Sequence, residues 1–150
     1  MKLGESIAVG AHQVMRREHD LLIFSVVGDV ALPEVDGILA QERALRAEVG
    51  YSLVLVDAHR MGTMPAPIRK HAAEVMRADA SYRGALAVWG APFVIRTLIN
   101  LILRATALLS RQARQPVEYF ASQSDGLRWL QTQRKTFQVA GSVRGGVASL

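Results

Sequence analysis

The sequence predicts a single α/β domain built on a mixed, mostly parallel sheet of about five strands with four helices. Three observations lead to this prediction. Short apolar runs of strand character alternate with longer segments in which apolar residues recur at helical spacing. Gly, Pro and Asp residues mark most of the junctions between them. The chain of 150 residues can fill one hydrophobic core, whereas two domains of ordinary size would not fit.

The first two strands are predicted to form a hairpin. A mixed segment, 9–18, forms a weak strand that ends at a turn of His19 and Asp20. The continuous apolar run Leu21–Val27 forms a buried strand, which Gly28 closes. Because only a tight turn separates the two strands, they are expected to run antiparallel.

A helix and a second buried strand follow. Pro33 stands in the first turn of the helix, where its missing N–H costs nothing, and Gly50 ends the helix. The apolar residues between them recur near the helical period: Val35, Ile38, Leu39, Leu45 and Val49. The next strand, Tyr51–Asp57, is almost continuously apolar up to its final aspartate.

The second half of the chain repeats this alternation. A loop rich in Gly and Pro over 60–67 leads to a helix that ends near Ser81. The apolar stripe of this helix consists of Ile68, Ala72, Val75 and Met76. A third buried strand covers Gly84–Trp89, and a long helix then runs from Pro92 to about Arg111.

One more strand and one more helix complete the domain. The strand covers Pro116–Ala121, and Ser122 with Asp125 has the spelling of a capping box for the final helix. Residues 138–150 contain three glycines among small polar residues and are predicted to form a flexible tail. The single domain is therefore expected to span residues 1–137.

Composition and charge argue against several classes of function. The chain has no cysteine, which excludes disulfide scaffolds and thiolate chemistry and fits a reducing compartment, so we expect a cytoplasmic protein. The net charge of +5 is dispersed and lacks interleaved aromatic residues, so nucleic acid is not an expected partner. The most apolar stretch, Phe93–Leu109, contains Arg96, Asn100 and Arg104, which argues against a membrane span.

The sequence contains no arrangement typical of an active site. The turns after the strands carry neither a Gly-x-Ser-x-Gly nucleophile motif nor a phosphate-binding glycine loop. The histidines His12, His19, His59 and His71 lack the spacing of a metal site, although the last two could approach each other. We therefore predict a protein that is not an enzyme and has neither a metal ion nor a cofactor.

The order of the elements and the spelling of their junctions resemble the SpoIIAA-like group of the STAS superfamily. The matching features are strands that end in glycine or aspartate, a strand with glycine at its exit, an apolar helix rich in arginine, and an aromatic strand followed by a helix start. Four of these segments read LLIFSVVGDV, LVLVDAHRMG, ALAVWGAP and PVEYF…SDGLRWL. In the last segment Gly126 stands where the family usually has alanine. The resemblance covers about residues 9–137.

The resemblance implies a regulatory module that acts through protein–protein contacts, as anti-sigma-factor antagonists do. In those relatives a kinase phosphorylates a serine in the loop after the aspartate-ending strand. Here the matching positions lie near Pro65 and Ala66, and Thr63 is the only hydroxyl residue of the loop, so that switch is not supported. Domains of the related CRAL-TRIO type bind lipids, which leaves a small hydrophobic-ligand or lipid carrier as the alternative function.

Candidate binding residues gather after the aspartate-ending strand. Asp57 stands at the carboxyl end of a parallel strand, which is the edge where α/β sheets bind ligands. The alternative is that its carboxylate only caps the following loop. His59, Arg60 and Thr63 follow closely and join Asp57 as candidate ligand- or partner-binding residues.

The long helix that starts at Pro92 carries a second group of candidates. Arg96, Asn100 and Arg104 fall on one narrow polar stripe and are candidate binding residues. The apolar arc is wider than packing on a sheet requires, and its candidate interface residues are Leu98, Ile99, Leu101, Ile102 and Leu109. Three explanations stay open: burial under a neighbouring helix, a homo-oligomer interface, or contact with a lipid or membrane surface. For the protein as a whole we expect a homodimer. A lipid carrier would use the crevice beside this helix.

Overall fold

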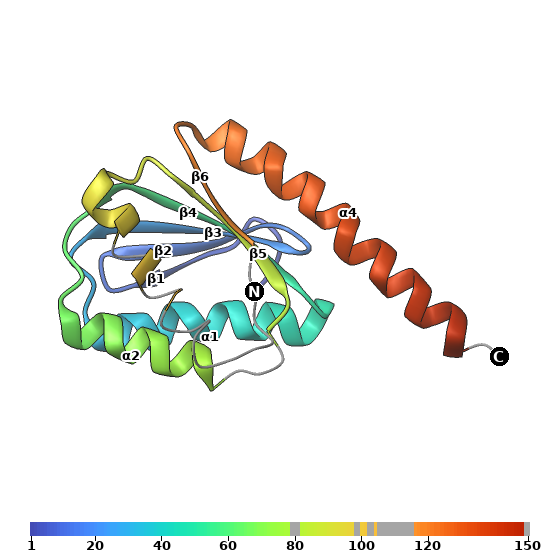
Figure 1. Cartoon of the computed structure of the whole chain (residues 1–150). Coiled ribbons are helices and arrows are strands. Elements are labelled where there is room, and N and C mark those ends of the chain that lie inside the picture. Colours follow the sequence, from blue (N-terminus) through green and yellow to red (C-terminus); the bar gives the residue numbers. More distant parts are fainter. Residues whose placement is uncertain (79–81, 98–99, 102–103, 105–115, 149–150) are drawn as a thin grey trace.

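The sheet is mixed and mostly parallel, as predicted. The computed structural model describes residues 1–78, 82–97, 100–101, 104 and 116–148. Its six strands lie in chain order in one sheet (Figure 1). They are β1 (Ser6–Val9), β2 (His12–Glu18), β3 (Leu21–Gly28), β4 (Ser52–Met61), β5 (Gly84–Trp89) and β6 (Val117–Phe120). The first three strands are antiparallel neighbours, whereas β3 to β6 run parallel.

The sheet has one strand more than the five expected, because the segment 9–18 takes part in two strands. β1 and β2 form a hairpin around Gly10, whose φ of 61° suits glycine, and Val9 pairs with His12 beside the turn. β1 is a short edge strand with alternately exposed and half-buried residues, so its apolar signal is too weak to recognise in the sequence. The predicted antiparallel pairing of β2 with β3 is confirmed.

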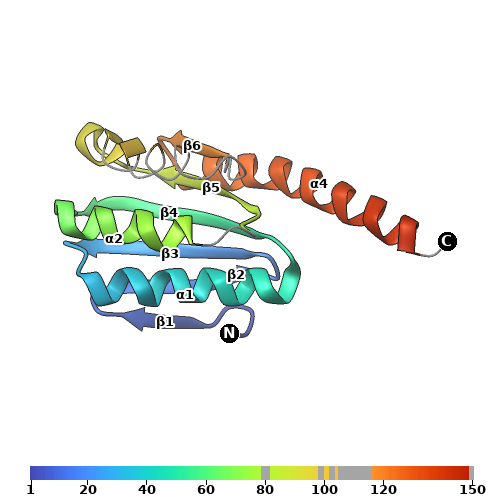
Figure 2. The ribbon, with the colours of Figure 1, turned by 60° about the horizontal axis from the view of Figure 1, so that its bottom comes forward.

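Helices cover both faces of the sheet. α1 (Leu32–Val49) and α2 (Ala66–Arg77) lie on one face, together with a third helical segment that includes residues 93–97, 100–101 and 104 (Figure 2). On that face Leu45 of α1 packs with Leu22 and Val54. On the opposite face α4 (Gln123–Ala148) packs on β4, β5 and β6, with Leu130 buried in the largest core cluster. Helices are therefore present in all four predicted places within the described residues, whereas the predicted helix ends near Ser81 and Arg111 lie outside them.

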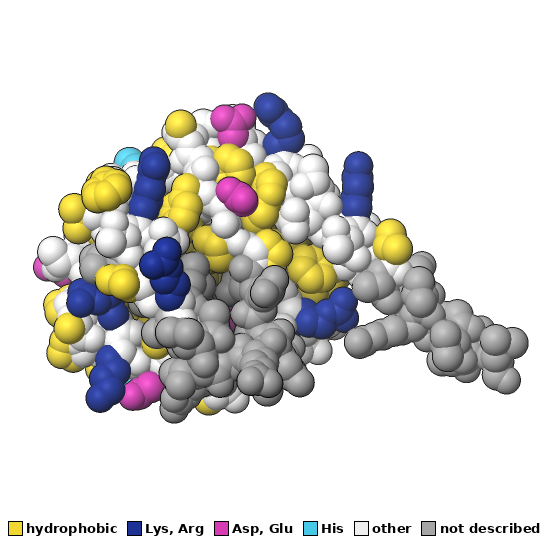
Figure 3. Space-filling model, in the orientation of Figure 1, with side chains coloured by type: hydrophobic (Ala, Val, Ile, Leu, Met, Phe, Trp, Pro, Cys, Tyr) yellow, Lys and Arg dark blue, Asp and Glu magenta, His cyan; other side chains and the backbone are white. Residues whose placement is uncertain are grey.

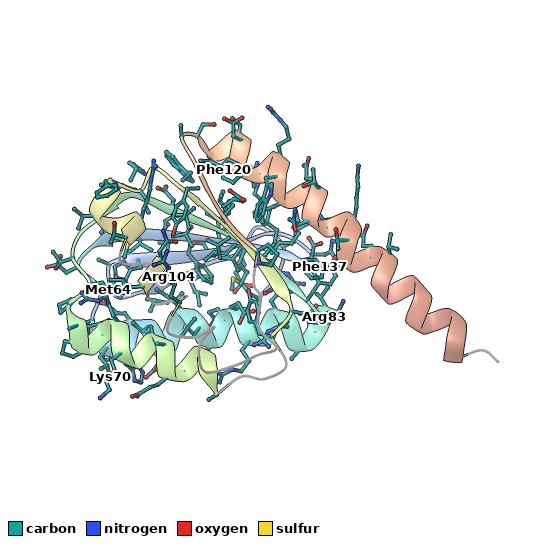
Figure 4. All side chains as sticks on the ribbon, viewed as in Figure 1. Met64, Lys70, Arg83, Arg104, Phe120 and Phe137 are labelled. Carbon is teal, nitrogen blue, oxygen red and sulfur yellow. The ribbon has the colours of Figure 1, made fainter. Side chains whose placement is uncertain are left out.

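α4 is longer than predicted. It continues to Ala148 and extends beyond the edge of the sheet, so most of the segment 138–150 is helical rather than irregular (Figure 1). Its glycines lower helix propensity by about 1 kcal/mol each, but a helix that has already formed extends at little further cost. The last aromatic residue of α4 is Phe137. Its ring centre lies 5.8 Å from the guanidinium of Arg83 (Figure 4).

A buried ionic cluster fixes α4 against the start of β3. Asp20 is fully buried, and its carboxylate accepts hydrogen bonds from Nε and Nη2 of Arg134 at 2.8 and 2.7 Å. Tyr51 Oη donates to the same carboxylate at 2.6 Å, and Glu18 also pairs with Arg134. Burial alone would raise the pKa of Asp20, but the hydrogen bonds from Arg134 and Tyr51 outweigh it and hold this pKa below its ordinary value.

The cluster predicts an alkaline transition that belongs to Tyr51. Burial, together with the hydrogen bond to the Asp20 carboxylate, raises the pKa of Tyr51 to about 12. A folded-state pKa above the unfolded value of about 10 stabilises the fold fully below pH ~10, and this stabilisation is lost as the pH rises through the folded-state pKa. We expect wild type to lose more stability than Tyr51→Phe between these two values, measured by urea unfolding. Equal losses would show that Tyr51 does not titrate in this way.

Candidate functional site

The residues that follow Asp57 lie in strand β4 rather than in a loop. Val27 and Gly28 of β3 pair with Arg60 and Met61, so the strand continues through Met61. The predicted loop over 60–67 therefore starts too early. The register between β3 and β4 shifts just before these pairs and leaves an extra residue on β4. Such a bulge changes the direction of nearby side chains, which single-sequence patterns do not reveal.

Asp57 and His59 form a hydrogen-bonded pair at the carboxyl end of β4. Asp57 Oδ1 accepts hydrogen bonds from His59 Nδ1 and from the His59 backbone N–H, the latter at 3.3 Å. Because a carboxylate can only accept, the proton lies on Nδ1, and Nε2 makes no hydrogen bond to a described residue. The side chain of His59 is 42% exposed. The structure thus joins two candidate residues, and Asp57 also caps local backbone as the alternative interpretation expected.

Trp89 completes this group. The rings of His59 and Trp89 stack with their centres 4.9 Å apart, because β5 pairs Trp89 directly with Asp57. The next residue, Gly90, has a φ of 73°, and a Cβ there would lie only 2.7 Å from the Cβ of His59. Trp89 was missed in the sequence because its place beside His59 follows from the register of two strands.

A serine lies beside this group without completing a nucleophilic relay. Ser25 of β3 pairs with Asp57 from the side opposite Trp89. Among the described residues no hydrogen bond joins Ser25 to His59, whereas a Ser–His–Asp relay requires the histidine between the serine and the aspartate. Within the part of the chain that the structure describes, no group of three His, Asp or Glu residues could hold a metal ion.

Thr63 is hydrogen-bonded to Asp29 in the loop after β3. Asp29 Oδ1 accepts hydrogen bonds from the backbone N–H and the hydroxyl of Thr63 at 2.7 and 2.9 Å, which lower the pKa of Asp29. The N–H of Val30 donates to the carbonyl of Thr63 at 3.3 Å. The Thr63 hydroxyl therefore holds two loops together at the carboxyl end of the sheet.

Three acidic residues at the carboxyl end of β3 and β4 accept hydrogen bonds within the chain, and two basic residues are exposed. Asp57 and Asp29 accept the hydrogen bonds described above, and Glu34 accepts from a buried histidine and from the backbone at the start of α1. The side chains of Arg60 and Arg104 are exposed. Figure 3 shows hydrophobic and basic side chains side by side on the left of the view, where β4 ends.

The predicted polar stripe partly faces β6. Tyr119 Oη donates to Asn100 Oδ1 at 2.8 Å, and the guanidinium of Arg96 lies 6.0 Å from the Tyr119 ring centre. Arg96 Nε also donates to the carbonyl of Ala91 at 3.0 Å. All three candidate binding residues on this helical segment are exposed, and two of them, Arg96 and Asn100, also make structural contacts.

The start of the third helical segment exposes large apolar side chains. Phe93 is 82% exposed and Val94 is 64% exposed, whereas Ile95 is buried against the sheet. Of the predicted interface residues, Leu101 is 50% exposed. The others lie outside the described residues: Leu98, Ile99, Ile102 and Leu109. We call Phe93, Val94 and Leu101 the docking face. Sequence reasoning missed its first two members because it placed the apolar surplus further along the helix.

His71 and His59 have different hydrogen-bond partners in the structure. His71 Nε2 lies 2.6 Å from Asp36 Oδ1 and joins α2 to α1. The helix stripe that carries His71 faces α1 rather than the carboxyl end of β4, so the two histidines serve different elements.

Among the described helices, none is long and apolar enough to cross a membrane.

Solved structures with similar folds provide the comparison. A protein of the DUF3478 family from Shewanella loihica PV-4, described as uncharacterised and SpoIIAA-like in fold, matches with a TM-score of 0.56 and 14% identity over 83% of this chain and 98% of that chain. The anti-sigma factor antagonist SpoIIAA in its unphosphorylated form matches with a TM-score of 0.55 and 12% identity, over 81% and 98%. No protein-family model and no curated protein matches. The chain has the SpoIIAA-like fold, which confirms the resemblance at that level.

Proposed function

We propose that this chain is a non-enzymatic, cytoplasmic regulatory module that binds a protein partner through the docking face. The observation that carries the proposal is the exposure of Phe93 and Val94, neighbours on a helical segment whose next residue is buried in the core. Large apolar side chains that are held in place and exposed together are typical of protein contact sites. The SpoIIAA-like fold supports a binding role without defining a partner.

The surroundings of the docking face suit a protein partner. Arg96 and Arg104 are exposed beside the apolar residues, and arginine and aromatic residues are enriched where proteins meet. The carboxylates of Asp57 and Asp29 are hydrogen-bonded to donors within the chain, so a partner with acidic groups fits best. Self-association is tested first, because it needs no protein other than this chain.

Replacing Phe93 and Val94 together by aspartate is expected to abolish binding. Loss of a central aromatic contact costs about 2 kcal/mol or more, roughly a thirtyfold loss of affinity. Sedimentation velocity over a range of concentrations measures self-association, and capture followed by mass spectrometry measures other partners. The matched control is Val139→Asp, which changes an equally exposed valine on α4.

The outcomes separate the proposal from its alternative. The proposal requires an association that wild type and the Val139 variant share and that the Phe93 and Val94 variant lacks. If all three proteins behave alike in both measurements, the docking face does not bind protein. A lipid that copurifies with wild type in native mass spectrometry would instead support the hydrophobic-ligand carrier.

A further inference from the structure

His59 differs from the other histidines in the way its ring is held. Its Nδ1 donates to Asp57, its ring rests on Trp89, and its Nε2 has no hydrogen bond to any described residue. Two neighbours therefore restrict rotation of the ring while the side chain stays 42% exposed. A group held in one orientation before a reaction loses less entropy when it reacts.

The remaining histidines provide internal comparisons. His12 is buried and both of its ring nitrogens are hydrogen-bonded. His71 presents the reverse arrangement, because Nε2 is engaged by Asp36 and only the more hindered Nδ1, next to Cβ, is left. His19 is 64% exposed but lies 3.8 Å from a carboxylate that already accepts three hydrogen bonds. Only His59 combines an exposed side chain and a carboxylate at Nδ1 with an Nε2 that has no hydrogen bond to a described residue.

A neutral imidazole nitrogen of this kind is a nucleophile. The carboxylate at Nδ1 stabilises the positive charge that the ring acquires when Nε2 forms a bond, which is the usual way of activating such a group. A metal ion would need further ligands, and the described residues offer no group of three. The net charge of +5 attracts anionic reagents.

We propose that His59 Nε2 is a phosphoryl-acceptor site that takes its phosphoryl group from an acyl phosphate or a phosphoramidate donor. Nε2 attacks the phosphorus, and the N–P bond forms as the bond from phosphorus to the leaving group breaks. The leaving group departs with the electron pair. The proton on Nδ1 stays in its hydrogen bond to Asp57, so no oxidant and no further reactant is needed.

The phosphoryl group would regulate the docking face. His59 contacts Gly90, and Phe93 follows three residues later, so the modified ring lies beside the start of the third helical segment. A phosphoryl group adds about 1.5 to 2 negative charges. This charge would repel an acidic partner and weaken its binding. This consequence rests on the proposed function, whereas the phosphoryl transfer does not.

The test uses the whole chain with potassium phosphoramidate and, separately, acetyl phosphate as donors. We expect one acid-labile, base-stable phosphoryl group by intact mass, located on His59 by peptide mapping and on Nε2 by separation of the two phosphohistidine isomers. His59→Gln is expected to lose the label, whereas His19→Gln and His71→Gln keep it. Asp57→Asn, which preserves shape but removes the charge, is expected to slow labelling about tenfold and to raise the share of the Nδ1 isomer.

Several results would overturn the proposal. They are labelling of His19 and His71 at the same rate as His59, label on Nδ1 of His59, or an Asp57→Asn variant that reacts as wild type does. Circular dichroism verifies the fold of each variant, and the isomer ratio in wild type decides the question even if a variant fails to fold. If labelling occurs as expected but does not change association, the regulatory consequence fails while the acceptor site stands. The proposed function itself is decided separately by the Phe93 and Val94 variant.

Discussion

Replacing Arg134 with methionine is expected to lower the free energy of unfolding by about 3–5 kcal/mol, as removal of one partner of a buried ion pair usually does. The substitution leaves the carboxylate of Asp20, which is fully buried, with only the hydroxyl of Tyr51 as a hydrogen-bond donor. Two charge-assisted hydrogen bonds to Asp20 are lost at the same time, together with the ion pair to Glu18. Urea unfolding followed by circular dichroism measures the change.

The control for this substitution lies on the same helix. Arg128 is 76% exposed and pairs only with Asp125, at 3.5 Å, so Arg128→Met is expected to change stability by less than about 0.5 kcal/mol. The free energy of unfolding that Arg134→Met costs is also expected to become smaller in acid. Because the pKa of Asp20 is lowered in the folded state, its contribution is complete above the unfolded-state pKa and is lost as the pH falls through the folded-state value. Equal stability of the two variants would contradict the assigned role of Arg134.

A double variant separates the ion pair from the helix packing. Asp20→Asn combined with Arg134→Met removes both charges, so the buried site no longer contains an unpaired ion. The combined loss is expected to be smaller than the sum of the two single losses, by about 0.5–3 kcal/mol, because the two side chains share one interaction. Additive losses would mean that Arg134 stabilises α4 by packing alone.

The sequence predicts the centre of this fold better than its edges. β3, β4 and β5 are buried on both faces, so their apolar runs are continuous and easy to recognise. β1 is an exposed edge strand, and the end of β4 is formed by polar residues that pair with β3, so neither has a hydrophobic pattern. The pairing of Asp20 with Arg134 joins residues 114 positions apart, and no local pattern encodes it.

The candidate site also contains residues that the sequence could reveal and residues that it could not. Asp57 and His59 could be chosen because polar residues directly after a buried parallel strand lie at the edge where ligands bind. Trp89 and Gly90 could not, because their contact with His59 depends on the pairing of β4 with β5. Phe93 follows a proline that marks a helix start, a signal that was available but did not distinguish an exposed aromatic residue from a buried one.

Replacing His12 with leucine is expected to lower the free energy of unfolding by about 2–4 kcal/mol. The sequence around His12 does not reveal the structural role behind this effect. The imidazole is 1% exposed and fixed in the opposite tautomer from that of His59. Its Nδ1 accepts from the backbone N–H of Val27 at 3.0 Å, so Nε2 carries the proton and donates to Glu34 at 2.8 Å. Glu34 in turn accepts the N–H of Ala31 at the start of α1. The ring therefore links β2, β3 and the first turn of α1.

Two pairs of isosteric variants separate the two hydrogen bonds of His12. Asparagine places an oxygen near the position of Nδ1 and leucine has the same shape, so the difference in unfolding free energy between His12→Asn and His12→Leu reports the bond to Val27. Glutamine and methionine report the bond to Glu34 in the same way. We expect the first difference to be about 1–3 kcal/mol, because an unpaired N–H would be left next to a buried side chain. The second is expected to be smaller, since the side chain of Glu34 is 22% exposed and water can replace the lost donor. A leucine variant as stable as the asparagine variant would mean that His12 acts by filling space and not by joining the two strands to α1.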